Sequence, residues 1–130
     1  AERTVPSAGS GDLEKLYIEV QPYGIFCAID LSGCTNTEPD ASERAIAALA
    51  EVMHCQKDDC AVKTFDHGNI TVHSVINMDS SIVIRRDLCS RSVHIDLFCK
   101  RYADPRSCAT AALEVFEAKS YKIHPAFRMA

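Results

Sequence analysis

The chain has 130 residues, of which 47% are hydrophobic and 25% are charged, with five glycines and five prolines. This length and composition are typical of one soluble globular domain and exclude a disordered or fibrous chain. The formal net charge is −4, so non-specific nucleic-acid binding, which needs a cationic surface, has no global support. No apolar run reaches the roughly 18 residues of a membrane-spanning helix, and we expect no membrane span.

The first 23 residues are predicted to be an N-terminal extension. Within it Leu16, Ile18 and Val20 alternate with more polar positions. This alternation predicts an edge strand or an ordered arm over residues 13–20.

The next two elements are a strand and a helix. Residues 24–32 predict a strand, because the odd positions are apolar while Phe26 and Ala28 make the other face apolar too. Both faces are therefore expected to be buried. Further on, Asp40 followed by Glu43 has the form of a capping box. A helix of about four turns is predicted from there to residues 55–57.

Strands dominate the middle of the chain, and a second helix follows them. Asp104 and Pro105 form a strong helix start, an N-cap carboxylate with proline at the first helical position. This helix is predicted to end near Ser120, and residues 121–130 are predicted to be an irregular tail. The predicted strands are a hairpin of residues 60–65 and 70–77 around a loop at 66–69, then residues 81–85 and 93–98.

This element order predicts an α+β fold, a two-layer sandwich with two helices on one face of a mainly antiparallel sheet. The folded domain is expected to span residues 24–120. Two helices cover only one face, so the apolar residues on the other face need a partner. We expect a homodimer or hetero-oligomer that forms through the open sheet face.

Cysteine usage bears on the compartment. The number of cysteines is odd and most lie inside apolar segments, whereas a disulfide framework pairs its cysteines in a loop-rich secreted chain. We therefore expect a reducing intracellular compartment, either the cytoplasm or an organelle matrix such as that of the mitochondrion. Most thiols are expected to behave as small buried hydrophobes. The cysteines are Cys27, Cys34, Cys55, Cys60, Cys89, Cys99 and Cys108.

Four segments, in chain order, resemble motifs of the bacterial-type S-adenosylmethionine decarboxylase family. Residues 24–34 read Gly-Ile-Phe-Cys-Ala-Ile-Asp-Leu-Ser-Gly-Cys and resemble the family's opening strand. Residues 65–72 resemble its glycine turn and strand. Residues 79–85 read Asp-Ser-Ser-Ile-Val-Ile-Arg and resemble its self-cleavage motif, Glu-Ser-His-(Ile/Leu)-x-Ile-His. Residues 94–99, with Asp-Pro at 104–105, resemble the segment that follows.

The resemblance covers roughly residues 24–120 and implies that family's sandwich fold, with dimers that pack sheet on sheet. It also implies a pyruvoyl enzyme of polyamine biosynthesis. In such an enzyme the motif serine attacks its preceding carbonyl, the ester eliminates, and the new pyruvoyl group takes the electrons of decarboxylation. By this resemblance Ser80 is the pyruvoyl precursor, and cleavage falls between Asp79 and Ser80.

The remaining motif positions differ from the family. Asp79 replaces its glutamate and Ser81 its first histidine. Arg85 stands at the histidine that assists the proton transfers of processing, and a guanidinium cannot act as a base. Lys100 stands at the catalytic cysteine. Cys99 is adjacent, but strand alternation points it to the opposite sheet face unless a one-residue bulge restores it.

Other groups offer weaker hypotheses. Phe65 either stacks on a substrate adenine, as a family phenylalanine does, or packs in the core. His54, Cys55, Cys60 and His67 are potential zinc ligands, but they contain no Cys-x-x-Cys pair, and we expect no metal site.

A basic cluster stands out against the negative net charge. Two interpretations are open: the cluster binds an acidic partner, a phosphate or RNA, or it is a solvated rim of the surface. Nucleic acid is otherwise not expected as a partner. The cluster consists of Arg85, Arg86, Arg91, Lys100, Arg101 and Arg106.

These observations favour a diverged member of the decarboxylase fold that has lost catalysis, carries no cofactor and acts as a regulatory or structural subunit. The alternative is an active pyruvoyl-dependent decarboxylase of S-adenosylmethionine or another amino acid. In that case it is self-processed at Asp79/Ser80, with the Ser80-derived pyruvoyl group as cofactor and Cys99 as proton donor. A third hypothesis is a sensor that binds S-adenosylmethionine without chemistry.

Overall fold

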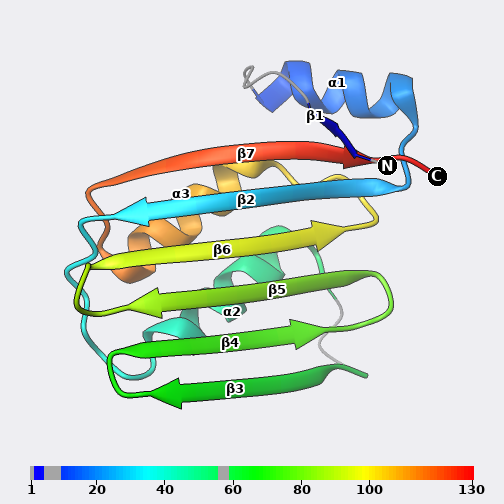
Figure 1. The fold of residues 1–130 in the computed structure, drawn as a ribbon. Helices are drawn as coiled ribbons and strands as arrows, with labels where there is room; N and C mark the ends of the chain where they lie inside the picture. Colours follow the sequence, from blue (N-terminus) through cyan, green and yellow to red (C-terminus); the bar gives the residue numbers. More distant parts are fainter. Residues whose placement is uncertain (1, 5–9, 56–58) are drawn as a thin grey trace.

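The computed structural model describes residues 2–4, 10–55 and 59–130. One open antiparallel sheet runs through this part of the chain, with strand order β1-β7-β2-β6-β5-β4-β3 (Figure 1). The strands are β1 (Glu2–Thr4), β2 (Gly24–Ser32), β3 (Ala61–His67), β4 (Ile70–Ile76), β5 (Ser80–Asp87), β6 (Ser92–Cys99) and β7 (Ser120–Arg128). The helices are α1 (Ser10–Val20), α2 (Ala41–Val52) and α3 (Pro105–Phe116). The predicted α+β sandwich with a mainly antiparallel sheet is confirmed.

The hydrophobic core lies between one face of the sheet and helices α2 and α3, which pack side by side against it (Figure 1). Alternate residues of each central strand enter this core because successive side chains of a strand point to opposite faces. Ile29 of β2, Ile84 of β5 and Ile95 of β6 are all buried there. They meet Leu49 of α2 and Phe116 of α3, which are also buried.

The predicted edge strand over residues 13–20 is wrong, since this segment belongs to helix α1. Its apolar residues follow a helical period: Leu13 is buried, and Leu16, Tyr17 and Val20 pack against the core. The weak period-two alternation was misleading, because Ile18 is 65% exposed. An i, i+3, i+4, i+7 stripe was the better signal. The prediction of two helices therefore missed a third.

Helix α2 forms without the predicted capping box. Asp40 occupies the N-cap position, but its side chain makes no cap hydrogen bond. Its carboxylate instead lies 3.4 Å from Nε of Arg44, one turn into the helix. The helix ends at Val52, earlier than predicted, and His54 then takes a left-handed backbone with φ of 54°. Lys57, within the predicted helix end, lies outside the described residues.

The predicted start of helix α3 is confirmed. Oδ2 of Asp104 accepts a hydrogen bond from the Ser107 amide at 3.1 Å, and Pro105 opens the helix. The helix stops at Phe116, short of the predicted Ser120, because Glu117 turns left-handed with φ of 50°. After this left-handed residue the chain leaves the helix axis and enters β7 at Ser120.

Residues 121–130 are not the predicted irregular tail, because most of them form β7. This strand pairs with β2 along its whole length, from Gly24↔Arg128 to Ser32↔Ser120. Pro125 masked the strand in the sequence, since proline cannot donate to a central ladder. It is accommodated because β1, as described, pairs only with residues 126–128 of β7.

The second face of the sheet has no helix over it within the described residues. Residues 24–32 were predicted to be buried on both faces. Within this chain only one of the two faces is buried. Ile25, Cys27, Ile29 and Leu31 are buried, whereas Phe26, Ala28 and Asp30 are only partly covered. The requirement for a partner on the open face stays a prediction.

The cysteines follow the expectation of buried thiols in part. Cys27, Cys34, Cys99 and Cys108 are buried, while Cys89 is exposed. Burial raises the pKa of the Cys27 and Cys108 thiols to about 12. These two thiols are therefore protonated core residues at physiological pH. In the residues that the structure describes, no helix is long and apolar enough to cross a membrane.

Candidate functional site

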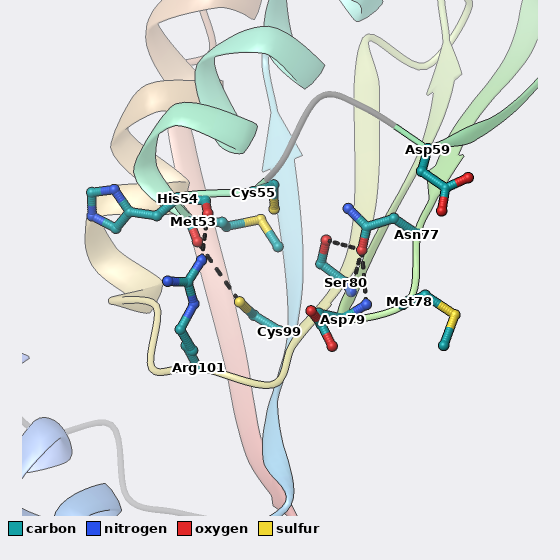
Figure 2. A pocket seen from close by; sticks show the side chains of 10 residues that line it. All are labelled: Met53, His54, Cys55, Asp59, Asn77, Met78, Asp79, Ser80, Cys99 and Arg101. Carbon is teal, nitrogen blue, oxygen red and sulfur yellow. Dashed lines mark hydrogen bonds between the residues drawn. The ribbon is translucent and has the colours of Figure 1, made fainter.

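A pocket of about 390 Å³ opens where the end of α2, the β4–β5 turn and the end of β6 meet (Figure 2). Three residues from the motif comparison, Asp79, Ser80 and Cys99, line it together. The other lining residues are Met53, His54, Cys55, Asp59, Asn77, Met78 and Arg101.

Ser80 and Cys99 lie opposite each other in the sheet. They are direct partners in the β5–β6 ladder, which continues without a bulge to Asp87↔Ser92. Both side chains are buried on the helix-covered side, Ser80 at 8% and Cys99 at 3% exposure. Contrary to the alternation argument, Cys99 therefore shares a face with Ser80 and needs no bulge to do so. Antiparallel pairing places opposite residues on one face whatever their sequence separation.

Lys100 takes a different place from the one that its motif position suggested. Its side chain lies on the outside, with Nζ 5.1 Å from the centre of the Tyr23 ring. Its backbone amide, however, donates to the carbonyl oxygen of Asp79 at 2.9 Å. This carbonyl belongs to the Asp79–Ser80 peptide bond.

Asn77 organises the turn between β4 and β5. Its Oδ1 accepts three hydrogen bonds, from the amides of Asp79 at 2.9 Å and Ser80 at 2.8 Å and from Oγ of Ser80 at 3.0 Å. Asparagine commonly caps turns in this way, because its short side chain reaches the backbone two residues on. In Figure 2 the three bonds converge on one oxygen at the pocket wall. Sequence reasoning did not single out Asn77.

Among the described residues, no base lies within hydrogen-bond distance of the Ser80 hydroxyl. Its one hydrogen-bond partner within that part of the chain is the Asn77 amide oxygen. His54 belongs to the pocket wall, but its ring points away from Ser80 (Figure 2). Arg85 lies on the open sheet face, where its guanidinium pairs with Asp96 at 3.1 Å.

Cys99 is held as a neutral thiol. Its Sγ lies 3.8 Å from the carbonyl oxygen of Met53, as a weak donor. Burial raises the pKa of this thiol above its ordinary value, and hydrogen bonding from the Arg101 backbone opposes this in part. A protonated thiol can donate a proton but is a poor nucleophile.

Charges of both signs surround the pocket. Asp59 and Asp79 bring carboxylates, both on exposed residues. Arg101 closes another side, and its guanidinium donates to the carbonyl oxygen of His54 at 2.6 Å. This bond ties the segment after β6 to the end of α2.

No protein-family model matches the chain, and no curated protein sequence matches it. A solved structure does: the crystal structure of the adenosylmethionine decarboxylase from Aquifex aeolicus VF5 has a TM-score of 0.63 to this chain. The match covers 84% of this chain and 92% of that chain, at 13% sequence identity. This chain has the adenosylmethionine decarboxylase fold. The resemblance noted in the sequence is thereby supported for the fold alone.

Within this decarboxylase fold, Phe65 lies away from the pocket. It is on β3, 49% exposed, and Nζ of Lys63 lies 5.4 Å from its ring centre. It is not among the residues that line the pocket. Phe65 does not pack in the core either, since every residue of β3 is exposed.

The four potential zinc ligands of the sequence do not converge. His54 and Cys55 lie at the pocket, but Cys60 precedes β3 and His67 ends it. A seven-residue strand separates its ends by about 20 Å. Among the described residues no group of three or more His, Cys, Asp or Glu side chains is placed to hold a metal ion.

The basic cluster is also dispersed by the decarboxylase fold. Arg85 faces the open side of β5, whereas Arg86 is buried on the other side. Arg86 donates to the carbonyl oxygens of Glu38 at 2.8 Å and Asn36 at 2.6 Å. It therefore has a structural role.

A polar cluster on the open face was missed. Oδ1 of Asp30 lies 2.7 Å from Nδ1 of His94, and its Oδ2 lies 3.3 Å from Nε2 of His124. Asp30 of β2 is the register partner of His94 of β6, whereas His124 of β7 is opposite Ala28, two residues along β2 on the same face. The hydrogen bond from His94 is the main reason why the pKa of Asp30 is lowered. A histidine or aspartate alternating with apolar residues in each strand was the available signal.

Proposed function

We propose that this chain is a diverged adenosylmethionine decarboxylase-like protein that does not process itself and acts as a regulatory or structural subunit. The observation that carries the proposal is the surroundings of Ser80. Its hydroxyl donates to an amide oxygen, which does not take up a proton near neutral pH. The family's histidine position, Arg85, lies on the other face and is paired with Asp96.

The open sheet face supports a role in assembly. It combines apolar side chains with paired charges, since Phe26 and Phe98 are cross-strand neighbours there and Arg85 pairs with Asp96. Tyr23 extends the apolar part, stacked on Phe98 with ring centres 6.0 Å apart. A partner of this face is either a second copy of this chain or a related decarboxylase-fold chain. The reducing intracellular compartment stays a prediction.

The first test is the denatured intact mass of protein purified from its native source. We expect a single mass for the whole chain, because among the described residues no base lies within hydrogen-bond distance of the Ser80 hydroxyl. Two fragments, residues 1–79 and residues 80–130 with a pyruvoyl end, would contradict the proposal.

The assembly role is tested with a charge at the centre of the open face. Val83 lies there, opposite Asp96 of β6. Val83→Lys is expected to lower the sedimentation coefficient from that of a dimer to that of a monomer, since removing a lysine charge from water opposes sheet-on-sheet packing even with Asp96 opposite it. Thr110→Lys, on the exposed side of α3, is the matched control and should sediment as wild type. Equal sedimentation of all three proteins as monomers, with no binding to a related decarboxylase, would argue against the proposal.

The alternative function is an active pyruvoyl-dependent decarboxylase of S-adenosylmethionine or another amino acid, in polyamine biosynthesis. Two observations favour it: Ser80 and Cys99 share one pocket, and the Lys100 amide donates to the Asp79 carbonyl. Ser80 would then supply the pyruvoyl group and Cys99 the proton. Carbon dioxide release from S-adenosylmethionine that is abolished in Ser80→Ala would establish this function. Absence of covalent trapping of labelled substrate by borohydride would exclude it.

A further inference from the structure

The peptide unit between Asp79 and Ser80 is held at all of its polar atoms. The Asp79 carbonyl accepts a hydrogen bond from the Lys100 amide at 2.9 Å. The Ser80 amide donates to Oδ1 of Asn77 at 2.8 Å. The backbone amide of Asn77 in turn donates to the Ser80 carbonyl oxygen at 3.0 Å. The peptide bond and the serine that follows it therefore have one fixed geometry.

The same Asn77 oxygen also receives the Ser80 hydroxyl. Oγ of Ser80 lies 3.0 Å from Oδ1, and this oxygen already accepts the amides of Asp79 and Ser80. Ser80 is 8% exposed, so the shared acceptor, rather than solvent, sets the direction of the hydroxyl. The Asn77 side-chain oxygen therefore sets the direction of the Ser80 hydroxyl, the group that would attack the Asp79 carbonyl.

We infer that Asn77 is the positioning residue of the Asp79–Ser80 bond, and that its neutral amide, standing where a base would act, keeps this bond intact. The inference rests on the proposed function, since both take the wild-type bond to be uncleaved. It goes further because it names one residue, absent from the family motif, on which cleavage depends.

The chemistry requires a proton acceptor at this oxygen. For the bond to rearrange, Oγ of Ser80 bonds to the carbonyl carbon of Asp79, the carbon–nitrogen bond breaks, and the hydroxyl proton passes through the acceptor to the nitrogen. An ester with a free amine results. The Lys100 amide is placed to stabilise the charge that develops on the carbonyl oxygen during the attack. An asparagine amide cannot carry the proton, whereas an aspartate carboxylate can.

The ester would then break by elimination. The Ser80 Cα loses a proton, and Oγ leaves with its electron pair as part of the Asp79 carboxylate. The dehydroalanine that remains rearranges to an imine, and water replaces its nitrogen, which leaves as ammonia. The products are a chain that ends at Asp79 and a chain that begins with a pyruvoyl group.

The test is Asn77→Asp, which keeps the shape of the side chain and its acceptor oxygen. We expect cleavage between Asp79 and Ser80 at least about 100-fold faster than in wild type, since a positioned general base contributes about 10²–10⁴-fold. The cleavage rate should rise with pH as the new carboxylate ionises and then level off. Hydroxylamine should capture the ester as a hydroxamate at Asp79. Intact mass against time measures all three.

Three controls separate positioning from a change in stability. Asn77→Asp combined with Ser80→Ala should stay intact, because the attacking oxygen is missing. Asn69→Asp puts the same charge in the β3–β4 turn, at the other end of β4, and should also stay intact. Asn77→Gly should stay intact in plain buffer but cleave in proportion to added formate, which can occupy the space of the lost side chain.

The outcomes distinguish this inference from the proposed function. Asn77→Asp that folds, by circular dichroism, and stays intact for days would overturn the inference and leave the proposed function standing. Should Asn77→Asp fail to fold, an Asn77→Gly protein that folds and is unaffected by formate would overturn the inference in the same way. Wild-type protein that cleaves as fast as Asn77→Asp would overturn both.

Discussion

At the scale of single residues, Asp30 shows how polar side chains occupy an open sheet face. Its two carboxylate oxygens contact His94 and His124 on the strands at either side. The pKa of Asp30 is lowered, first by the hydrogen bond from His94 and then by the other contacts, against the opposing effect of burial. A depressed carboxylate pKa means that the folded state favours the ionised form.

Replacing this carboxylate should cost stability in a pH-dependent way. The contribution of Asp30 is complete above the ordinary aspartate value of 3.8 and is lost as the pH falls through the lower, folded value. The side chains of Asp30 and His94 are 43% and 56% exposed, so solvent screening limits the effect to under about 1 kcal/mol. Asp30→Asn should therefore unfold at lower urea than wild type at pH 7 but not at pH 2. A difference that grows on acidification would contradict this assignment.

The residues of the candidate site were predictable to different degrees. Ser80, Asp79 and Cys99 could be selected from the motif, because a motif fixes residue types along the chain. Asn77 could not, since its role depends on a turn that folds its side chain back onto two amides and a hydroxyl. The face of Cys99 was also out of reach, because it depends on the β5–β6 register.

At the scale of elements, Arg86 of β5 ties three parts of the fold together. Its guanidinium donates to the carbonyl oxygens of Asn36 and Glu38, in the segment before α2. It also lies 5.6 Å from the centre of the Phe116 ring of α3. Burial lowers the pKa of this guanidinium, yet the side chain stays protonated at working pH. The charge is compensated by carbonyl dipoles.

Arg86→Ala should destabilise the protein far more than its neighbour. It leaves a buried and a partly buried carbonyl oxygen without their donor, which we expect to cost about 2–4 kcal/mol of unfolding free energy. Arg85→Ala is the matched control, because its pair with Asp96 is about half exposed on both sides. It should cost under about 1 kcal/mol. Equal losses in urea unfolding would show that Arg86 has no such role.

Elements with strong end signals were the easier ones to predict. Asp104 and Pro105 specify the start of α3 by a local hydrogen bond and a fixed φ, so the sequence suffices. Helix α1 was missed because the weak alternation around Ile18 obscured a helical stripe that includes Leu13 and Tyr17. Strand β7 was missed because Pro125 argues against a central strand, and the described part of β1 pairs only with residues 126–128.

At the scale of the whole molecule, the helix layer is narrower than the sheet. Helix α2 contacts β5 and β4, but β3 lies beyond it, with every residue exposed. Val62 and Phe65 are 67% and 49% exposed, on the two faces of this strand. The central strands β2 and β6 are buried on one face and paired on both edges.

Hydrogen exchange should therefore divide the sheet. The amides of β3 are expected to exchange by local opening, far faster than those of β2 and β6, which need global unfolding. Exchange followed by mass spectrometry of peptides from residues 61–67 and 92–99 measures the contrast. Equal protection of the two peptides would mean that β3 is covered in solution, for instance by another chain.

The position of β7 sets a time at which the fold can close during synthesis. This strand comes last among the elements, yet it lies inside the sheet between β1 and β2. At about 5–20 residues per second, a ribosome releases β2 several seconds before β7. Throughout that interval the edge of β2 is bare, which is the kind of edge that recruits foreign strands. A nascent chain cut short before residue 120 keeps that edge for good, so chaperone binding should depend steeply on the point of truncation.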